Sequence, residues 1–124
     1  MVAIDSSTWI AFVQGDKGAD VERLDASLAA GDAAFPLVAL TEVLSEPKLP
    51  KEQRAILLAL PTIGLTDGYW FRAAATRAAL LARGLRARLP DTLIAQSCID
   101  NDVELIARDS HYRHFAKHCG LRLA

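Results

Sequence analysis

The stretch VAIDSSTWIAFV, residues 2–13, contains the pattern that decides the fold. It begins with three apolar residues, a run typical of a short buried strand. Asp5 comes next, followed by hydroxyl residues at 6–8, which favour the N-cap of a helix. Apolar residues then recur at helical spacing up to Gly15. The stretch therefore predicts a strand, an acidic residue at the end of that strand, and a helix.

The same alternation continues along the chain. The predicted strands are residues 2–4, 35–38, 62–65 and 103–107. The predicted helices are residues 9–13, 21–29, 41–46, 51–60, 68–83, 91–98 and 111–118. We expect Thr66 or Asp67 to cap the longest helix. Strands that alternate with helices indicate parallel strands joined by right-handed crossovers. The prediction is one α/β domain over residues 1–124, with a central parallel sheet of four to five strands flanked by helices.

The composition is that of a globular, non-membrane protein. Hydrophobic residues make up 52% of the chain and charged residues 23%, and no apolar run approaches the ~20 residues that span a bilayer. Nothing at the start resembles a signal peptide, so we expect a cytoplasmic protein, with Cys98 and Cys119 unpaired. The net charge of −1 argues against a broad basic surface, but 14 Lys and Arg residues can supply a local basic rim.

Four acidic residues lie where strands end or helices begin. Asp5 and Asp109 each follow a predicted strand, and we expect Glu42 and Asp91 in the first turn of a helix. Because ligands bind outside the carboxyl ends of parallel strands, these four acids are predicted to share one crevice. Taken singly, each has an ordinary explanation: Asp5 and Asp91 as helix caps, Glu42 as a solvated helix residue and Asp109 as a turn residue.

Four carboxylates in one crevice need compensation. Two of them ~4 Å apart repel by about 4 kcal/mol at an effective dielectric of 20, and helix dipoles offset only about 0.3–1 kcal/mol each. A hard divalent cation such as Mg²⁺ or Mn²⁺ prefers oxygen ligands and would compensate. Such an ion can activate water for phosphodiester hydrolysis. Raised carboxyl pKa values are the other way to relieve the repulsion.

Four blocks of sequence, in this order, resemble the signature blocks of PIN-domain nucleases. They are IDSS at 4–7 followed by WI at 9–10, TEV at 41–43, DTLIA at 91–95 and LIARDSHY at 105–112. The likeness is strongest to the VapC-type toxins of toxin–antitoxin pairs, and it covers essentially the whole chain.

The resemblance implies a metal-dependent endoribonuclease. Asp5, Glu42, Asp91 and Asp109 match the family's acidic quartet that holds Mg²⁺ or Mn²⁺, and Ser7 matches a small polar position beside the first acid. The family cleaves RNA, often tRNA or ribosomal RNA, usually as a homodimer, and is silenced by a cognate antitoxin. The alternative is a PIN-fold module that binds a partner with weak or no catalysis.

One departure from the family pattern concerns the fourth block. Many relatives carry another acid two residues after the fourth, where this chain has His111, so a second metal ion is not expected by default. His111 either contacts phosphate or caps the last helix. His114 and His118 are four residues apart but lack a third ligand, so we do not expect zinc.

Basic and aromatic residues near the acids are further candidates. Five arginines flank the third and fourth acids and are candidates for binding RNA phosphates: Arg83, Arg86, Arg88, Arg108 and Arg113. Each is equally explained as part of a solvated basic face. Four aromatics at helix starts are expected in core or dimer packing, although base stacking is the other explanation: Trp9, Tyr69, Trp70 and Phe71.

Two other classes share this kind of sheet. A phospho-acceptor receiver domain needs an acidic pair after the first strand, but Ser6 follows Asp5 here. A haloacid-dehalogenase-like phosphatase needs a second Asp two residues after the first, and Ser7 occupies that position. The sequence therefore favours the nuclease.

Overall fold

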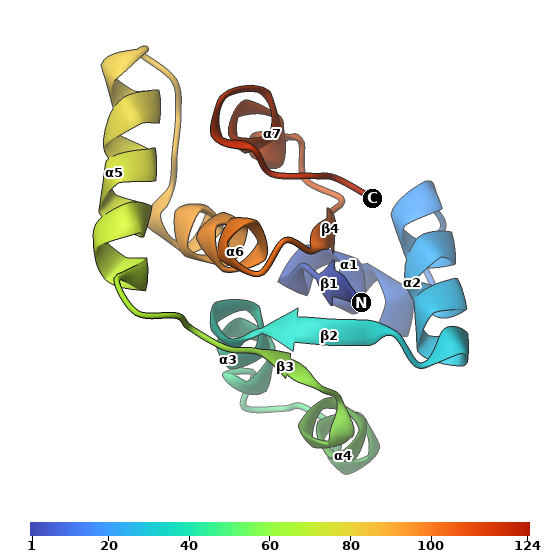
Figure 1. The fold of residues 1–124 in the computed structure, drawn as a ribbon. Coiled ribbons are helices and arrows are strands. Elements are labelled where there is room, and N and C mark those ends of the chain that lie inside the picture. The colour runs from blue at the N-terminus through green and yellow to red at the C-terminus, as the bar shows by residue number, and fades with distance from the viewer.

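The computed structural model describes residues 1–124 as one α/β domain, as predicted (Figure 1). The strands are β1 (Val2–Ile4), β2 (Ala33–Pro36), β3 (Thr62–Ile63) and β4 (Glu104–Ile106). The helices are α1 (Ser6–Val13), α2 (Ala19–Ala30), α3 (Leu37–Leu44), α4 (Lys51–Ala59), α5 (Tyr69–Ala82), α6 (Leu89–Asp100), the short 3₁₀ helix η1 (Ser110–Tyr112) and α7 (Arg113–Cys119). No helix is both long enough and apolar enough to cross a membrane.

The four strands form a single sheet in the order β3-β2-β1-β4, and every neighbouring pair is parallel. Ala3 pairs with Ala34 on one side and with Leu105 on the other. At the carboxyl end, Ile4 pairs with Ile106, and the Asp5 N–H donates to the carbonyl of Ile106 at 3.0 Å. This register brings the first and last acidic segments to the same edge of the sheet.

The core lies on both sides of this sheet and is built from aliphatic and aromatic side chains. Trp9 from α1 packs edge-on against Phe35 of β2, with ring centroids 5.8 Å apart. Phe115 of α7 is fully buried, and Cys98 of α6 is a buried free thiol, as expected. At the start of α5, which lies at one edge of the molecule (Figure 1), Tyr69 is buried whereas its neighbours Trp70 and Phe71 are exposed.

The predicted strand at 35–38 and the helix start near Thr41 were wrong. The strand ends at Pro36, and α3 begins at Leu37. Pro36 lacks an N–H and has φ −58° and ψ 139°, a conformation suited to the residue that precedes a helix. The apolar residues after it then follow helical spacing. As a result Glu42 lies in the second turn of α3, not in the first.

Other boundaries also differ from the predictions. The α1 N-cap is Asp5 itself, whose carboxylate accepts from the Ser7 N–H, and not one of the hydroxyl residues at 6–8. The N-cap of α5 is Gly68, with φ +80°, in place of Thr66 or Asp67. The strand at 62–65 is only two residues long, and the last helix divides into η1 and α7.

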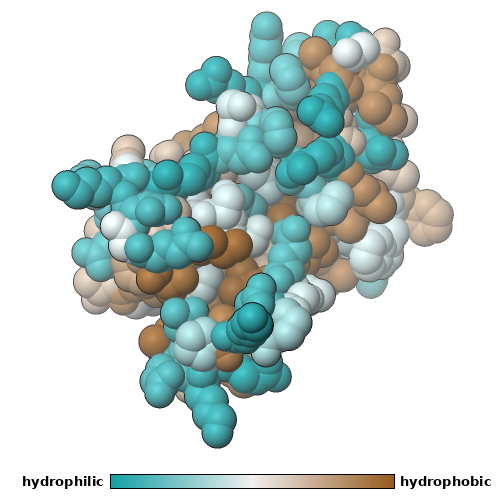
Figure 2. Space-filling view, turned by 180° about the vertical axis from the view of Figure 1, so that it is seen from behind, coloured by the Kyte–Doolittle hydropathy of each residue, from teal (hydrophilic) through white to brown (hydrophobic).

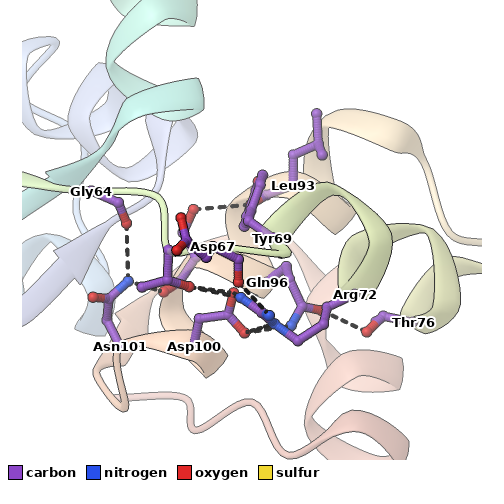
Figure 3. A network of polar contacts seen from close by, with 11 residues as sticks. Gly64, Asp67, Tyr69, Arg72, Thr76, Leu93, Gln96, Asp100 and Asn101 are labelled. Carbon is purple, nitrogen blue, oxygen red and sulfur yellow. Dashed lines mark hydrogen bonds and ion pairs between the residues drawn. The ribbon is translucent and has the colours of Figure 1, made fainter.

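A polar network explains why Thr66 does not cap α5 (Figure 3). Asp100, at the end of α6, forms an ion pair with Arg72 of α5 at 2.8 Å and accepts from the Thr66 hydroxyl and the Gln96 amide. Asn101 donates to the carbonyl of Gly64. These bonds fasten the β3–α5 connection to α6 and fix the position of α6 relative to the sheet.

Candidate active site

Asp5 is a buried carboxylate at the carboxyl end of β1, with only 4% of its surface exposed. Its Oδ1 accepts from the Tyr112 hydroxyl at 2.8 Å, and its Oδ2 accepts from both the hydroxyl and the N–H of Ser7. Burial raises the Asp5 pKa, the hydrogen bonds from Ser7 and Tyr112 oppose that rise, and the charge of Asp91 adds to it. Ser7 therefore contacts the first acid through both its hydroxyl and its backbone N–H.

Glu42 lies on α3, at the rim of the same site. Its Oε1 accepts from the Ser6 hydroxyl at 3.1 Å. Partial burial of the carboxyl is the largest cause of a raised Glu42 pKa. The Ser6 hydrogen bond opposes this rise, while the charges of Asp5 and Asp91 add to it. Glu42 is thus electrostatically coupled to two other acids from distant segments.

Asp91 lies in the first turn of α6, as predicted, and is buried. Its Oδ2 is 3.1 Å from Nε of Arg88 and 3.6 Å from Nδ1 of His111. Asp91 is therefore held at the start of α6 by its ion pair with Arg88.

Asp109 follows β4 and is the N-cap of η1. Its Oδ1 accepts from the His111 N–H at 2.9 Å, and its Oδ2 lies 3.0 Å from His111 Nδ1. That ring nitrogen is buried and is not aligned for a hydrogen bond with either carboxylate. His111 therefore lies between the third and fourth acids, with its ring nitrogen close to both carboxylates.

The four predicted acids thus form one group, which we call the acidic cluster: Asp5, Glu42, Asp91 and Asp109. The charge of Asp91 raises the pKa of Asp5, the charges of Asp5 and Asp91 raise that of Glu42, and His111 lies between Asp91 and Asp109. Tyr112, three residues after Asp109, reaches back to Asp5. The convergence predicted from the ends of the strands is present, although Glu42 reaches it from the second turn of its helix.

The chemistry of these donors suits a hard divalent cation. Carboxylate oxygens are the preferred ligands of Mg²⁺ and Mn²⁺, and the buried Nδ1 of His111, which makes no hydrogen bond, marks a polar position between two of these carboxylates. The side chains of the acidic cluster are farther apart than the ligands of a bound ion, because no three Asp, Glu, His or Cys side chains converge closely enough to hold one ion as they stand. Side chains of the acidic cluster would have to turn toward one another to share a cation.

The five candidate arginines divide into two kinds. Arg88 pairs with Asp91, and Arg108 pairs with Asp20 at 3.0 Å and donates to the carbonyl of Lys17. Arg108 is thereby a structural link between β4 and α2, so its guanidinium is already engaged and is a poor candidate for RNA phosphates. Three others are exposed and pair with no acid: Arg83, Arg86 and Arg113.

Sequence reasoning missed two of the residues that shape the site. Ser6 was expected only as a helix cap, and Tyr112 only as part of a motif, yet both donate to acids of the cluster. For Tyr112 the available signal was an aromatic hydroxyl placed just after Asp109, in a block that also carries His111. Its partner is 107 positions away, so no local pattern identifies the pair.

A hollow of about 640 Å³ opens beside the acidic cluster. Its walls come from α1, α3 and the start of α4, and Glu42 forms part of one wall. Trp9, Ile10, Val43 and Leu49 contribute apolar surface to it. The site therefore has an amphipathic recess on the Glu42 side.

Comparison with known proteins gives a consistent result. A family model described as PIN domain matches residues 2–118. A chain of the VapBC2 complex from Rickettsia felis, bound to a DNA fragment from its promoter, has TM-score 0.71 at 21% identity, over 100% of this chain and 98% of that one. A chain of a toxin–antitoxin complex from Klebsiella pneumoniae has TM-score 0.68 at 20% identity, over 98% of this chain and 95% of that one. A chain of FitAcB from Neisseria gonorrhoeae has TM-score 0.71 at 13% identity, over 99% of this chain and 96% of that one. No curated protein matched the chain.

Proposed function

Since the chain belongs to the PIN-domain family, whose members are generally nucleases, we propose that it is a Mg²⁺- or Mn²⁺-dependent endoribonuclease and the toxin of a toxin–antitoxin pair. Its reaction would be hydrolysis of phosphodiester bonds in RNA, with tRNA or ribosomal RNA as plausible targets. The domain responsible comprises residues 1–124.

The observation that carries this proposal is the mutual coupling of acids from separate segments. Burial and neighbouring negative charge raise the pKa of Asp5, although two hydroxyls donate to its carboxylate. A purely structural carboxylate gains nothing from being buried beside others of its own charge. Such an arrangement is typical of sites that use the charge for binding or catalysis.

The acidic cluster would hold the divalent cation, and its donor chemistry fits that role. A cation bound there would supply Lewis-acid polarisation of a phosphoryl oxygen and activation of a water for attack. The surrounding residues have distinct tasks. Ser7 and Tyr112 orient the Asp5 carboxylate and favour its ionised form, while Arg88 and His111 hold Asp91 and Asp109.

The expected partners follow from the same family. The structures from Rickettsia felis and Klebsiella pneumoniae are toxin–antitoxin assemblies, and by analogy a cognate antitoxin would silence this protein in the cytoplasm. We also propose a homodimer. Phe71 and Trp70 on α5 are 84% and 60% exposed, and apolar groups follow the edge that α5 forms, on the right in Figure 2. Sedimentation velocity of wild-type and Phe71→Glu protein tests this.

The nuclease test is Asp5→Asn. Asparagine keeps the shape but removes the charge, and its single amide oxygen can accept from Tyr112 or from Ser7 but not from both. We expect wild-type protein with Mg²⁺ or Mn²⁺ to cleave total RNA, and Asp5→Asn to lose about 100-fold or more of this activity, in the range found for preorganised electrostatic groups. Asp25→Asn, at an exposed position on α2, is the matched control and should cleave normally.

Two results would contradict the enzyme. One is the absence of metal-dependent cleavage by purified, antitoxin-free wild-type protein, and the other is equal cleavage by Asp5→Asn. Either would favour the alternative, a PIN-fold module that binds a partner with little or no catalysis. The open spacing of the acidic cluster is the one observation on that side.

The toxin assignment has its own test. Expression of soluble wild-type protein without its antitoxin should arrest growth, and expression of Asp5→Asn should not. Normal growth of cells that make the soluble wild-type protein would refute the toxin role while leaving RNA cleavage in vitro as a separate question.

A further inference from the structure

Positive charge is concentrated in two segments of the chain. Residues 68–90 and 110–124 contain no acidic residue, yet they carry 8 of the 14 Lys and Arg residues and all 3 histidines. The rest of the chain is correspondingly acidic, and the net charge is −1. Although the net charge is close to zero, positive and negative charges are therefore distributed very unevenly along the chain.

Half of these eight Lys and Arg side chains already have a partner within the protein. Four have partners: Arg72 pairs with Asp100, Arg77 donates to the carbonyl of Ala87, Arg88 pairs with Asp91, and Arg122 pairs with Asp102. Four exposed cations pair with no acid: Arg83, Arg86, Arg113 and Lys117. The unpaired charges thus come from the end of α5, the α5–α6 turn and α7.

Packing of α7 against α5 gathers part of this charge into one place. His114, Lys117 and His118 have the spacing of one helix face. Arg83, at the C-terminal end of α5, lies near this face because α7 packs against α5, and its positive charge is among those that, after desolvation, lower the pKa of His118. We call Arg83, His114, Lys117 and His118 the cationic ridge.

The ridge begins beside the acidic cluster. Asp109 caps η1, and α7 follows η1 directly, so the chain passes from the fourth acid to the ridge within a few residues. The seven residues of α7 extend roughly 10 Å at 1.5 Å per residue.

An RNA-cleaving site built from carboxylates repels its own substrate, because every phosphodiester carries a negative charge. Attraction must come from cations that are near the site but not neutralised by it. Arg88 and His111 are engaged with the acids themselves, and Arg108 is engaged with Asp20. Arg83 and Lys117 of the ridge are neighbouring cations that have no such partner.

We propose that the cationic ridge binds the phosphate backbone of the RNA strand and leads it to the acidic cluster. This inference rests on the proposed ribonuclease function. Of the arginines predicted from the sequence to bind RNA phosphates, the proposal keeps Arg83 and leaves out Arg88 and Arg108. It adds three residues of α7, namely His114, Lys117 and His118. Because the ridge offers charge and no arrangement for reading bases, its contribution is independent of RNA sequence.

The test compares two charge-matched double variants, both in the Asp5→Asn background so that the probe survives. The ridge variant is Arg83→Gln with Lys117→Gln, and the control is Lys51→Gln with Arg54→Gln on α4, where both residues are exposed. The probe is a fluorescein-labelled 12-nucleotide single-stranded RNA, and its anisotropy is measured from 50 to 200 mM KCl. Circular dichroism and melting temperature verify that each protein is folded.

Loss of two phosphate contacts should reduce the slope of log affinity against log salt by about 1.4, at about 0.7 per contact. The advantage of the parent protein over the ridge variant should then shrink about sevenfold between 50 and 200 mM KCl. The control should match its parent in affinity and slope.

Three outcomes would contradict the proposed role of the ridge. The ridge variant binds RNA as tightly as its control, both double variants lose the same amount of RNA affinity, or the parent shows no salt-dependent RNA binding. A fourth also overturns it, namely unchanged RNA binding with loss of binding to a labelled oligoglutamate peptide, which would assign the ridge to an acidic protein partner. Failure of the ribonuclease itself is detected separately, by wild-type protein that binds the probe but cleaves no RNA with Mg²⁺ or Mn²⁺.

Discussion

Tyr112→Phe isolates one contact of the acidic cluster. The Tyr112 hydroxyl is the only group removed, and the ring that remains fills the same space in the core. Tyr112 is 1% exposed and donates to Oδ1 of Asp5 at 2.8 Å. Without this donor the Asp5 carboxylate is left buried with the hydrogen bonds from Ser7 alone. We expect a loss of stability that depends on whether Asp5 is ionised.

The magnitude follows from the charge of the acceptor. A hydrogen bond to a charged group contributes about 1.5–3 kcal/mol, and one between neutral groups about 0.5–1.5 kcal/mol. The folded-state pKa of Asp5 is raised, so the native protein binds the Asp5 proton more tightly than the unfolded chain does. Ionised Asp5 therefore destabilises the fold above that pKa, and this penalty disappears as the pH falls through it.

Tyr112 offsets part of that penalty, so its removal should cost about 1.5–3 kcal/mol at pH 8 and about 1 kcal/mol at pH 4. The difference reflects a further rise of the Asp5 pKa in the variant, because the Tyr112 hydrogen bond opposes that rise in the wild-type protein. The chain offers a matched control in Tyr69→Phe. Tyr69 is also 1% exposed, but its hydroxyl donates to the neutral carbonyl of Leu93.

The assay is urea unfolding of wild-type, Tyr112→Phe and Tyr69→Phe protein between pH 4 and pH 8, with EDTA present. Tyr69→Phe should lose about 0.5–1.5 kcal/mol at every pH. The reasoning is refuted if the loss for Tyr112→Phe is equally independent of pH, or if it decreases as the pH rises.

Three further predictions concern the contacts that hold the site in place. Arg72 holds the pKa of Asp100 below its usual value, so this pair stabilises the fold above the pKa that Asp100 has in the unfolded chain, and the stabilisation is lost as the pH falls through the pKa in the folded protein. Asp100→Asn should therefore lower the free energy of unfolding by about 1–2 kcal/mol at pH 7. In urea unfolding, the stability of this variant should also fall less steeply than that of the wild type as the pH becomes acidic. Gly68→Ala should cost about 1–2 kcal/mol, because φ is +80° and the new Cβ would lie 2.7 Å from Nη1 of Arg72, and an unchanged melting temperature would contradict this. Arg108→Ala should lower stability by about 1 kcal/mol through loss of the Asp20 pair while salt-dependent RNA binding stays unchanged; a reduced salt slope would restore Arg108 as a phosphate-binding residue.

Much of the fold was predictable because its signals are local. The apolar run before Asp5 and the one before Asp109 identify buried strands, and Pro90 with Asp91 identifies a helix start. Parallel order then follows from the alternation of strands and helices. Errors occurred at boundaries where two local signals compete, as at Pro36, which is compatible with both a strand end and a residue before a helix.

The sequence by itself determined the order of elements and the edge of the sheet to which the four acids are brought, because hydrophobic periodicity depends on near neighbours. Only the tertiary structure decided which side chains meet there. Tyr112 reaches Asp5 across 107 positions, and Arg88 and Arg108 turn to different acids although both precede one by three residues or fewer. A long side chain pairs with whichever partner packing places within its reach, and that partner is not encoded in the residues beside it.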